Sequence, residues 1–168
     1  DSVEVTGKSC CFPAGTKITM ANGCKKNIED VKIGDSVLSY NPTLKKYSSW
    51  TVKNLGSPVH EVLDINNGLL RLTCDHPIYL KKKDGRVGWG AIDPTLATDA
   101  CRLRKPILPV DVGDSVLISN NRWVEITKIT HPAGVVQTYN IVSYIGKHTY
   151  FANDVLVFEE YPRVWTVN

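Results

Sequence analysis

The sequence predicts a single all-β domain, and two observations support this. Short segments rich in β-branched residues recur along the chain and are separated by turn signals, which is typical of all-β proteins. In addition, one short sequence pattern occurs twice, once in each half of the chain. With 168 residues, of which 42% are apolar and 22% charged, the chain is long enough to form one hydrophobic core of ordinary size.

Turn signals delimit the strands that we expect in the first half. Ala21-Asn22-Gly23, Asn66-Asn67-Gly68 and Asp84-Gly85 combine residues that adopt tight turns readily. Strands are expected over residues 16–20, 36–40, 50–52, 61–65, 69–73 and 78–80.

One segment interrupts this series with a helical pattern. Residues 94–101 are rich in Ala, Leu and Thr, and Pro94 fits the first position of a helix. Strands then resume over residues 115–119, 123–129, 135–142, 149–151 and 155–157. The predicted fold class is therefore all-β with at most one or two short helices.

The repeated pattern links the two halves of the chain. VKIGDSVLS at 31–39 resembles VDVGDSVLI at 110–118, and GDSVL is common to both. Each copy is followed by a tryptophan, Trp50 or Trp123, that opens a β-rich run. Either a common Gly-Asp turn has recurred by chance, or a β-subdomain has been duplicated. Two copies are too few for a solenoid.

Charge and cysteine content exclude several classes of protein. A net charge of +3, with 20 basic and 17 acidic residues scattered along the chain, does not predict a nucleic-acid partner. No apolar run approaches the ~18 residues of a membrane span. The five cysteines cannot all pair, and none lies in a CxxC or Cys/His pattern with zinc spacing. We expect a soluble monomer without a metal or a cofactor.

Three short motifs contain the residues that are best suited to catalysis. They contain Cys11, Thr73 with His76, and His148. A cysteine nucleophile needs a group that takes its proton, and cleavage of an amide needs a proton for the departing nitrogen. Histidine suits both tasks, although one cysteine and two histidines alone are weak evidence.

The sequences of these motifs, and their order along the chain, resemble those of one protein family. CFPAGTKI at 11–18, LTCDHP at 72–77, TYNIV at 138–142 and HTYFANDVLV at 148–157 are similar to the first, middle and last motifs of the Hint family. That family includes the self-processing domains of inteins, bacterial intein-like proteins and hedgehog C-terminal regions, and domains associated with von Willebrand A modules. The resemblance implies a pseudo-twofold β-horseshoe of two related subdomains, without an endonuclease insert.

The resemblance also implies domain limits and a reaction. Residues 11–157 would form the Hint domain, residues 1–10 an upstream remnant, and residues 158–168 a C-terminal extension of uncertain role. The Cys11 thiol would attack the carbonyl of Cys10 in an N-to-S acyl shift, and the resulting thioester would replace the Cys10–Cys11 peptide bond. Cys10 is an alternative nucleophile, but Phe12 fits the position after the family's cysteine.

Further roles follow from the same resemblance. His76 would protonate the nitrogen of Cys11, Thr73 would hold that peptide in a polarised geometry, and His148 would assist the second half of the reaction. Asn140 stands where many relatives carry Asp or Cys, which puts a general acid there in doubt. Alternation along a strand would turn at least one of Cys74 and Asp75 away from the site. The remaining cysteines and histidines are expected to be bystanders: Cys24, Cys74, Cys101, His60 and His131.

The C-terminal motif departs from that of splicing relatives. Their last strand runs directly into a His-Asn pair, whereas here Phe158 and Glu159 follow it. Asn168 is either a displaced cyclising residue or an ordinary one. If cyclisation is absent, an external nucleophile such as water, an amine, a thiol or an alcohol must resolve the thioester.

Three functions therefore remain open. The first is cleavage of the chain's own backbone in a single turnover, with its flanking segments as partners. The second is full protein splicing that uses Asn168. The third is a degenerate Hint fold that acts only as a binding module. The sequence identifies neither the host protein nor its compartment.

Overall fold

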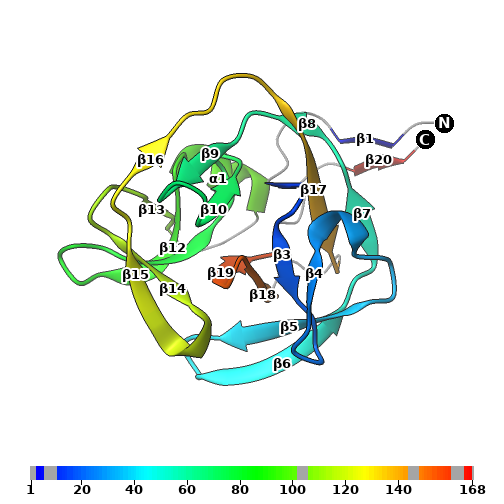
Figure 1. The fold of residues 1–168 in the computed structure, drawn as a ribbon, viewed down its shortest axis with the longest axis horizontal. Helices are drawn as coiled ribbons and strands as arrows, with labels where there is room; N and C mark the ends of the chain where they lie inside the picture. Colours follow the sequence, from blue (N-terminus) through cyan, green and yellow to red (C-terminus); the bar gives the residue numbers. More distant parts are fainter. Residues whose placement is uncertain (1–2, 6–10, 102–105, 144–147, 160–164, 168) are drawn as a thin grey trace.

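A computed structural model describes residues 3–5, 11–101, 106–143, 148–159 and 165–167. These residues are mostly β-strand (Figure 1). The helices among them are one α-helix, α1 (Pro94–Cys101), and two single-turn 3-10 helices, η1 (Ile28–Asp30) and η2 (Ser119–Asn121). The predicted fold class is confirmed, and α1 has the bounds that the sequence indicates.

The β-hairpin of β18 (Thr149–Ala152) and β19 (Val155–Phe158) lies in the middle of the molecule (Figure 1). Asn153 and Asp154 form its turn with positive φ angles of 49° and 65°, which asparagine and aspartate tolerate better than most residues. The hairpin joins elements of both halves into one sheet. The order of this sheet is β13 (Leu108–Pro109), β12 (Val87–Ala91), β11 (Ile78–Lys81), β14 (Ser115–Ile118), β19, β18, β3 (Lys17–Thr19) and β4 (Lys25–Asn27), with β15 (Arg122–Glu125) paired to β14.

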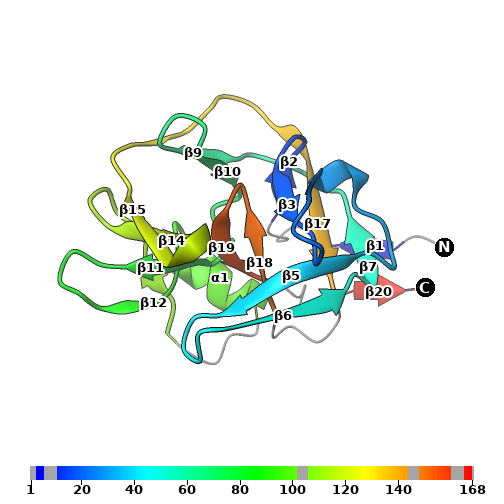
Figure 2. The same ribbon diagram turned by 60° about the horizontal axis from the view of Figure 1, so that its bottom comes forward.

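Smaller sheets surround the hairpin (Figure 2). In one of them, the strand that follows Cys11 pairs with a strand from the second half of the chain, with Phe12 opposite Tyr139. This sheet consists of β2 (Phe12–Pro13), β17 (Val136–Val142), β7 (Asn54–Gly56) and β8 (Val59–His60). The others are β10 (Leu70–Leu72) with β9 (Leu63–Ile65) and β16 (Ile129–Thr130), β5 (Ser36–Asn41) with β6 (Lys46–Thr51), and β1 (Val3–Val5) with β20 (Trp165–Val167).

The two GDSVL copies adopt the same turn. The side chain of Asp35 accepts a hydrogen bond of 2.9 Å from the backbone N–H of Lys32, and Asp114 accepts one of 2.9 Å from Asp111. Both preceding glycines have a φ of 97°, in the region that favours glycine. The same sequence thus forms the same structure twice, which favours duplication over chance.

A lysine from a neighbouring segment binds the aspartate of each turn, but the two ion pairs differ in burial. Lys26 Nζ lies 2.9 Å from Asp35, and these side chains are 37% and 26% exposed. Lys82 Nζ lies 2.5 Å from Asp114, and here the exposed fractions are 8% and 1%. The second turn therefore lies deeper in the protein than the first.

Two details of the predicted repeat were wrong. The expected strand at 123–129 is broken, because β15 ends at Glu125 and β16 begins at Ile129, in a different sheet. Trp50 also does not open a β-rich run, because it is the last residue but one of β6 (Lys46–Thr51). It pairs with Val37, whereas Trp123 pairs with Leu117, one position further along the repeat.

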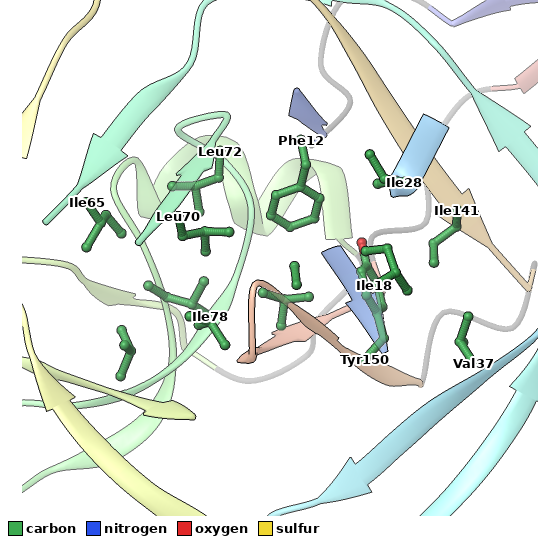
Figure 3. Close-up of a cluster of buried hydrophobic side chains, with 14 of the residues drawn as sticks. Phe12, Ile18, Ile28, Val37, Ile65, Leu70, Leu72, Ile78, Ile141 and Tyr150 are labelled. Atoms are coloured by element: carbon green, nitrogen blue, oxygen red, sulfur yellow. The ribbon is translucent and has the colours of Figure 1, made fainter. Parts of the chain in front are cut away.

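The main hydrophobic core contains side chains from both halves of the chain (Figure 3). Phe12, Ile18 and Tyr150 are fully buried in it, together with Leu70 and Ile78. Because Phe12 is fixed in this core, the backbone of its neighbour Cys11 is held in place as well.

Candidate active site

Cys11 and Thr73 are bound to each other at the edge of the core. Cys11 immediately precedes β2, and Thr73 immediately follows β10. The backbone N–H of Cys11 donates to Thr73 Oγ1 over 2.9 Å, and the backbone N–H of Thr73 donates to the Cys11 carbonyl over 3.1 Å. Cys11 is fully buried, and Thr73 is 4% exposed.

Asp75 extends this contact into a chain of hydrogen bonds. The hydroxyl of Thr73 donates to Asp75 Oδ1 over 2.8 Å. Because its only hydrogen points to Asp75, Thr73 Oγ1 presents lone pairs to the N–H of Cys11. Burial raises the pKa of the Asp75 carboxyl, while the hydrogen bond from Thr73 acts in the opposite direction.

Residues 73–76 do not have the alternating side-chain directions of a β-strand. The backbone N–H of His76 donates to the carbonyl of Thr73 over 3.3 Å, which closes residues 73–76 into a turn. Asp75 points to Thr73 for this reason, and the sequence analysis missed its contact. Cys74 is half-buried, and desolvation is the main cause that raises the pKa of its thiol.

His76 lies beside the residue that follows Cys11. Its ring is fully buried, and its centroid is 4.3 Å from that of Phe12. Nε2 lies 3.0 Å from the carbonyl oxygen of Phe158, which can only accept, so Nε2 carries the proton of the neutral ring. Burial lowers the pKa of His76 to about 3, although the bond to Phe158 opposes the shift, and the imidazole is therefore neutral at pH 7.

His148 is held by a buried carboxylate. It immediately precedes β18, and its Nδ1 lies 2.9 Å from Ser143 Oγ and 3.2 Å from Glu159 Oε1. The ring stacks on Trp50 with centroids 5.3 Å apart and an interplanar angle of 18°. The side chain of His148 is 28% exposed, whereas that of Glu159 is fully buried.

Phe158, the last residue of β19, and Glu159, which follows it, each contact one of the two histidines. Phe158 accepts the hydrogen bond of His76, and Glu159 contacts His148. The backbone N–H of Glu159 also donates to the carbonyl of His148 over 2.7 Å. Adjacent residues at the end of β19 thus contact the two histidines.

Solved structures with the same architecture are inteins and intein-like domains. A bacterial intein-like domain from Clostridium thermocellum is 27% identical, with a TM-score of 0.60 over 88% of this chain and 97% of that chain. A DnaB intein from Synechocystis sp. PCC 6803 is 19% identical, with a TM-score of 0.61 over 90% and 99%. The gp41-1 intein is 16% identical, with a TM-score of 0.57 over 89% and 98%. The chain has the fold of the Hint/intein domains.

Comparisons of sequence alone find no similar protein for this chain. No protein-family model matches it, and no curated protein matches it.

The remaining sequence predictions concern Asn140, Cys10 and Asn168. Asn140 is 2% exposed, and its Oδ1 has no hydrogen-bond partner among the described residues. It follows Tyr139, the partner of Phe12, in β17 and pairs with Gly56 of β7. Cys10 and Asn168 lie outside the described residues.

Glu159 and Ser143 are the other site residues that the sequence analysis missed. From sequence, Glu159 belongs to the predicted C-terminal extension, and its position directly after β19 is the one signal that indicates it. Neither a metal cluster nor a membrane helix occurs within the described ranges: no three His, Cys, Asp or Glu side chains there are arranged to hold a metal, and no helix is long and apolar enough to cross a bilayer.

Proposed function

We propose that this Hint domain performs an N-to-S acyl shift at Cys11 and so cleaves its own chain once. The Cys11 sulfur attacks the carbonyl carbon of Cys10, the C–N bond breaks, and Cys10 becomes a thioester on Cys11. The observation that carries this proposal is the hydrogen bond from the Cys11 nitrogen to Thr73, which holds the departing atom in a buried setting. Fixing the reacting peptide in this way is the main contribution that a scaffold makes to an intramolecular reaction.

His76 would move the proton in this step. Since Nε2–H is directed to the Phe158 carbonyl, Nδ1 of the neutral ring carries the lone pair. We infer that Nδ1 takes the thiol proton of Cys11 and then gives it to the Cys11 nitrogen as the C–N bond breaks. Since the pKa of the ring is about 3, His76 is a weak base that holds the thiol proton only in passing, and the protonated ring gives it readily to that nitrogen.

The thioester can react in two ways. In the first, an external nucleophile such as water, an amine or a thiol releases the upstream segment. In the second, Asn168 cyclises and the domain splices its flanking segments. One observation favours keeping splicing as a candidate: β20 pairs with β1, with Val3 opposite Val167, so segments from both flanks lie side by side (Figure 1).

A thiol-release experiment tests the proposal. The purified chain is incubated with an excess of a small thiol, and the products are weighed by mass spectrometry. We expect a fragment that ends at Cys10 as its thioester or acid, and a fragment that begins at Cys11. Cys11→Ala should release nothing, and Cys24→Ala, at an exposed thiol, is the matched control that should release as the wild type does.

The alternatives give different products. Absence of release from the wild type, with no difference from Cys11→Ala, would favour a degenerate Hint domain that only binds partners. On a precursor extended beyond Asn168, ligated flanks and an aminosuccinimide on Asn168 would indicate splicing. A fragment that ends at Ser9 would identify Cys10 as the nucleophile.

A further inference from the structure

Hydrogen bonds join Ser143 and His148, which precede the central hairpin, to Glu159, which follows it. Ser143 contributes both its backbone N–H, to Glu159 Oε2, and its hydroxyl, to Oε1 over 2.8 Å. His148 Nδ1 faces the same hydroxyl oxygen and the same carboxylate oxygen. Glu159 is fully buried, so its carboxyl oxygens are satisfied by these donors rather than by water.

The direction of these bonds fixes the tautomer of His148. The only hydroxyl hydrogen of Ser143 is donated to Glu159, so Ser143 Oγ can only accept from the ring. Glu159 Oε1 also accepts. Both neighbours of Nδ1 are therefore acceptors, which places a proton on Nδ1 and leaves the lone pair of the neutral ring on Nε2. The ring is also clamped in orientation by its stacking on Trp50.

Glu159 stands at a position of special interest in a Hint domain. It is the second residue after Val157, where the family resemblance leads one to expect the cyclising asparagine. A glutamate has no amide nitrogen with which to attack its own backbone carbonyl. Its carboxylate is instead committed to Ser143 and His148, so this end of the site is arranged around a histidine base.

We propose that Glu159 is a positioning residue that holds His148 with its proton on Nδ1, so that Nε2 acts as general base for the water that hydrolyses the Cys10–Cys11 thioester. In this step Nε2 takes a proton from water, and the water oxygen bonds to the Cys10 carbonyl carbon. The C–S bond then breaks, and the proton passes from Nε2 to the Cys11 sulfur. The inference rests on the acyl shift proposed above and names water as the natural nucleophile.

Two rates measured on the same chain test this role. Release by an added thiol reports the acyl shift, because a thiolate attacks the thioester without a general base. Release without thiol reports hydrolysis. Glu159→Gln keeps the shape of the side chain but presents an NH₂ group, which turns the ring toward the other tautomer. We expect hydrolysis to fall roughly 10²-fold or more, in the range of lost general-base catalysis, with thiol release within about twofold of wild type.

Controls separate this role from a purely structural one. Glu125→Gln removes an exposed carboxylate in β15 and should change neither rate. The nitrogen NMR shifts of His148 should show a protonated Nδ1 in the wild type and an unprotonated Nδ1 in Glu159→Gln. If that variant does not fold, His148→Gln, at a partly exposed position, should show the same selective loss of hydrolysis.

The outcomes that overturn the inference are distinct from failure of the proposed function. Equal losses of hydrolysis and thiol release in the folded variants would make Glu159 structural only. Hydrolysis at the wild-type rate in Glu159→Gln, or an unprotonated Nδ1 in the wild type, would exclude its role in positioning the base. A wild-type chain that releases nothing even with thiol would instead refute the acyl shift itself.

Discussion

Thr73 accepts a hydrogen bond of 2.9 Å from the backbone nitrogen of Cys11, the atom that must leave in the proposed acyl shift. The same threonine donates its hydroxyl proton to Asp75, so its lone pairs are directed to Cys11. This places a fixed dipole against the reacting peptide in a part of the protein that excludes water. Electrostatic contacts of this kind are strongest where the surroundings are buried and cannot reorganise.

Thr73→Val should therefore slow thiol-triggered release by about 10²-fold, the scale of a small misplacement at a reacting centre. Valine keeps the shape of threonine but offers neither an acceptor to Cys11 nor a donor to Asp75. Unsatisfied buried partners should also lower the free energy of unfolding by about 1–3 kcal/mol. Thr73→Ser, which keeps the hydroxyl, is the matched control, and wild-type release from the valine variant would refute the contact's role.

The buried carboxyl of Asp75 should give the protein a characteristic pH dependence. Its folded-state pKa is raised by burial above the ordinary value of 3.8, so the neutral form is the one that suits the fold. Its contribution to stability is full below the unfolded pKa and is lost as the pH rises through the raised folded pKa. Asp75→Asn keeps an oxygen for Thr73 and cannot titrate.

Urea unfolding at a series of pH values from 3 upward checks this prediction. The free energy of unfolding of Asp75→Asn, relative to wild type, should increase as the pH rises. A difference that is constant with pH would mean that the carboxyl does not titrate differently in the folded and unfolded chains.

His76 should show the opposite pH dependence. Because its pKa falls from 6.5 to about 3 on folding, the unfolded chain binds a proton between these values that the folded chain does not. Its contribution to stability is therefore present above pH 6.5 and is lost as the pH falls toward 3. In NMR spectra, the carbon-bound ring protons of His76 should not shift between pH 8 and 5. A midpoint near 6.5 would show that the ring is open to solvent.

The sequence predicts most of the fold because its signals here are local. Alternating β-branched segments, turn residues and Pro94 at a helix start depend on neighbours in the chain, and the elements they indicate are present. The GDSVL copies also form matching turns. What fails is the run at 123–129, where Glu125 and Ile129 belong to different sheets, since pairing with distant strands decides where a strand ends.

The site is less predictable because its contacts join residues far apart in sequence. The sequence motifs indicate four residues of the site: Cys11, Thr73, His76 and His148. The role of Asp75 depends on a turn that alternation cannot describe. Glu159 contacts His148 only because β18 and β19 pair, a relation that no local pattern contains.

The two GDSVL turns allow a matched test of how burial changes the contribution of an ion pair to the free energy of unfolding. Burial opposes the charge of Lys82, but hydrogen bonds to Asp114 and Asp111 prevail and raise its pKa. Lys82→Met would leave Asp114, which is 1% exposed, without its cation, so we expect a loss of about 3–5 kcal/mol in the free energy of unfolding.

Lys26→Met removes the equivalent partner of Asp35, where water can solvate the remaining carboxylate, and should cost less than about 1 kcal/mol. Urea unfolding of both variants at neutral pH measures the difference. The double variant Lys82→Met with Asp114→Asn should recover part of the loss, because it removes the uncompensated charge. Equal effects of the two single lysine variants would show that the second turn is as accessible to water as the first.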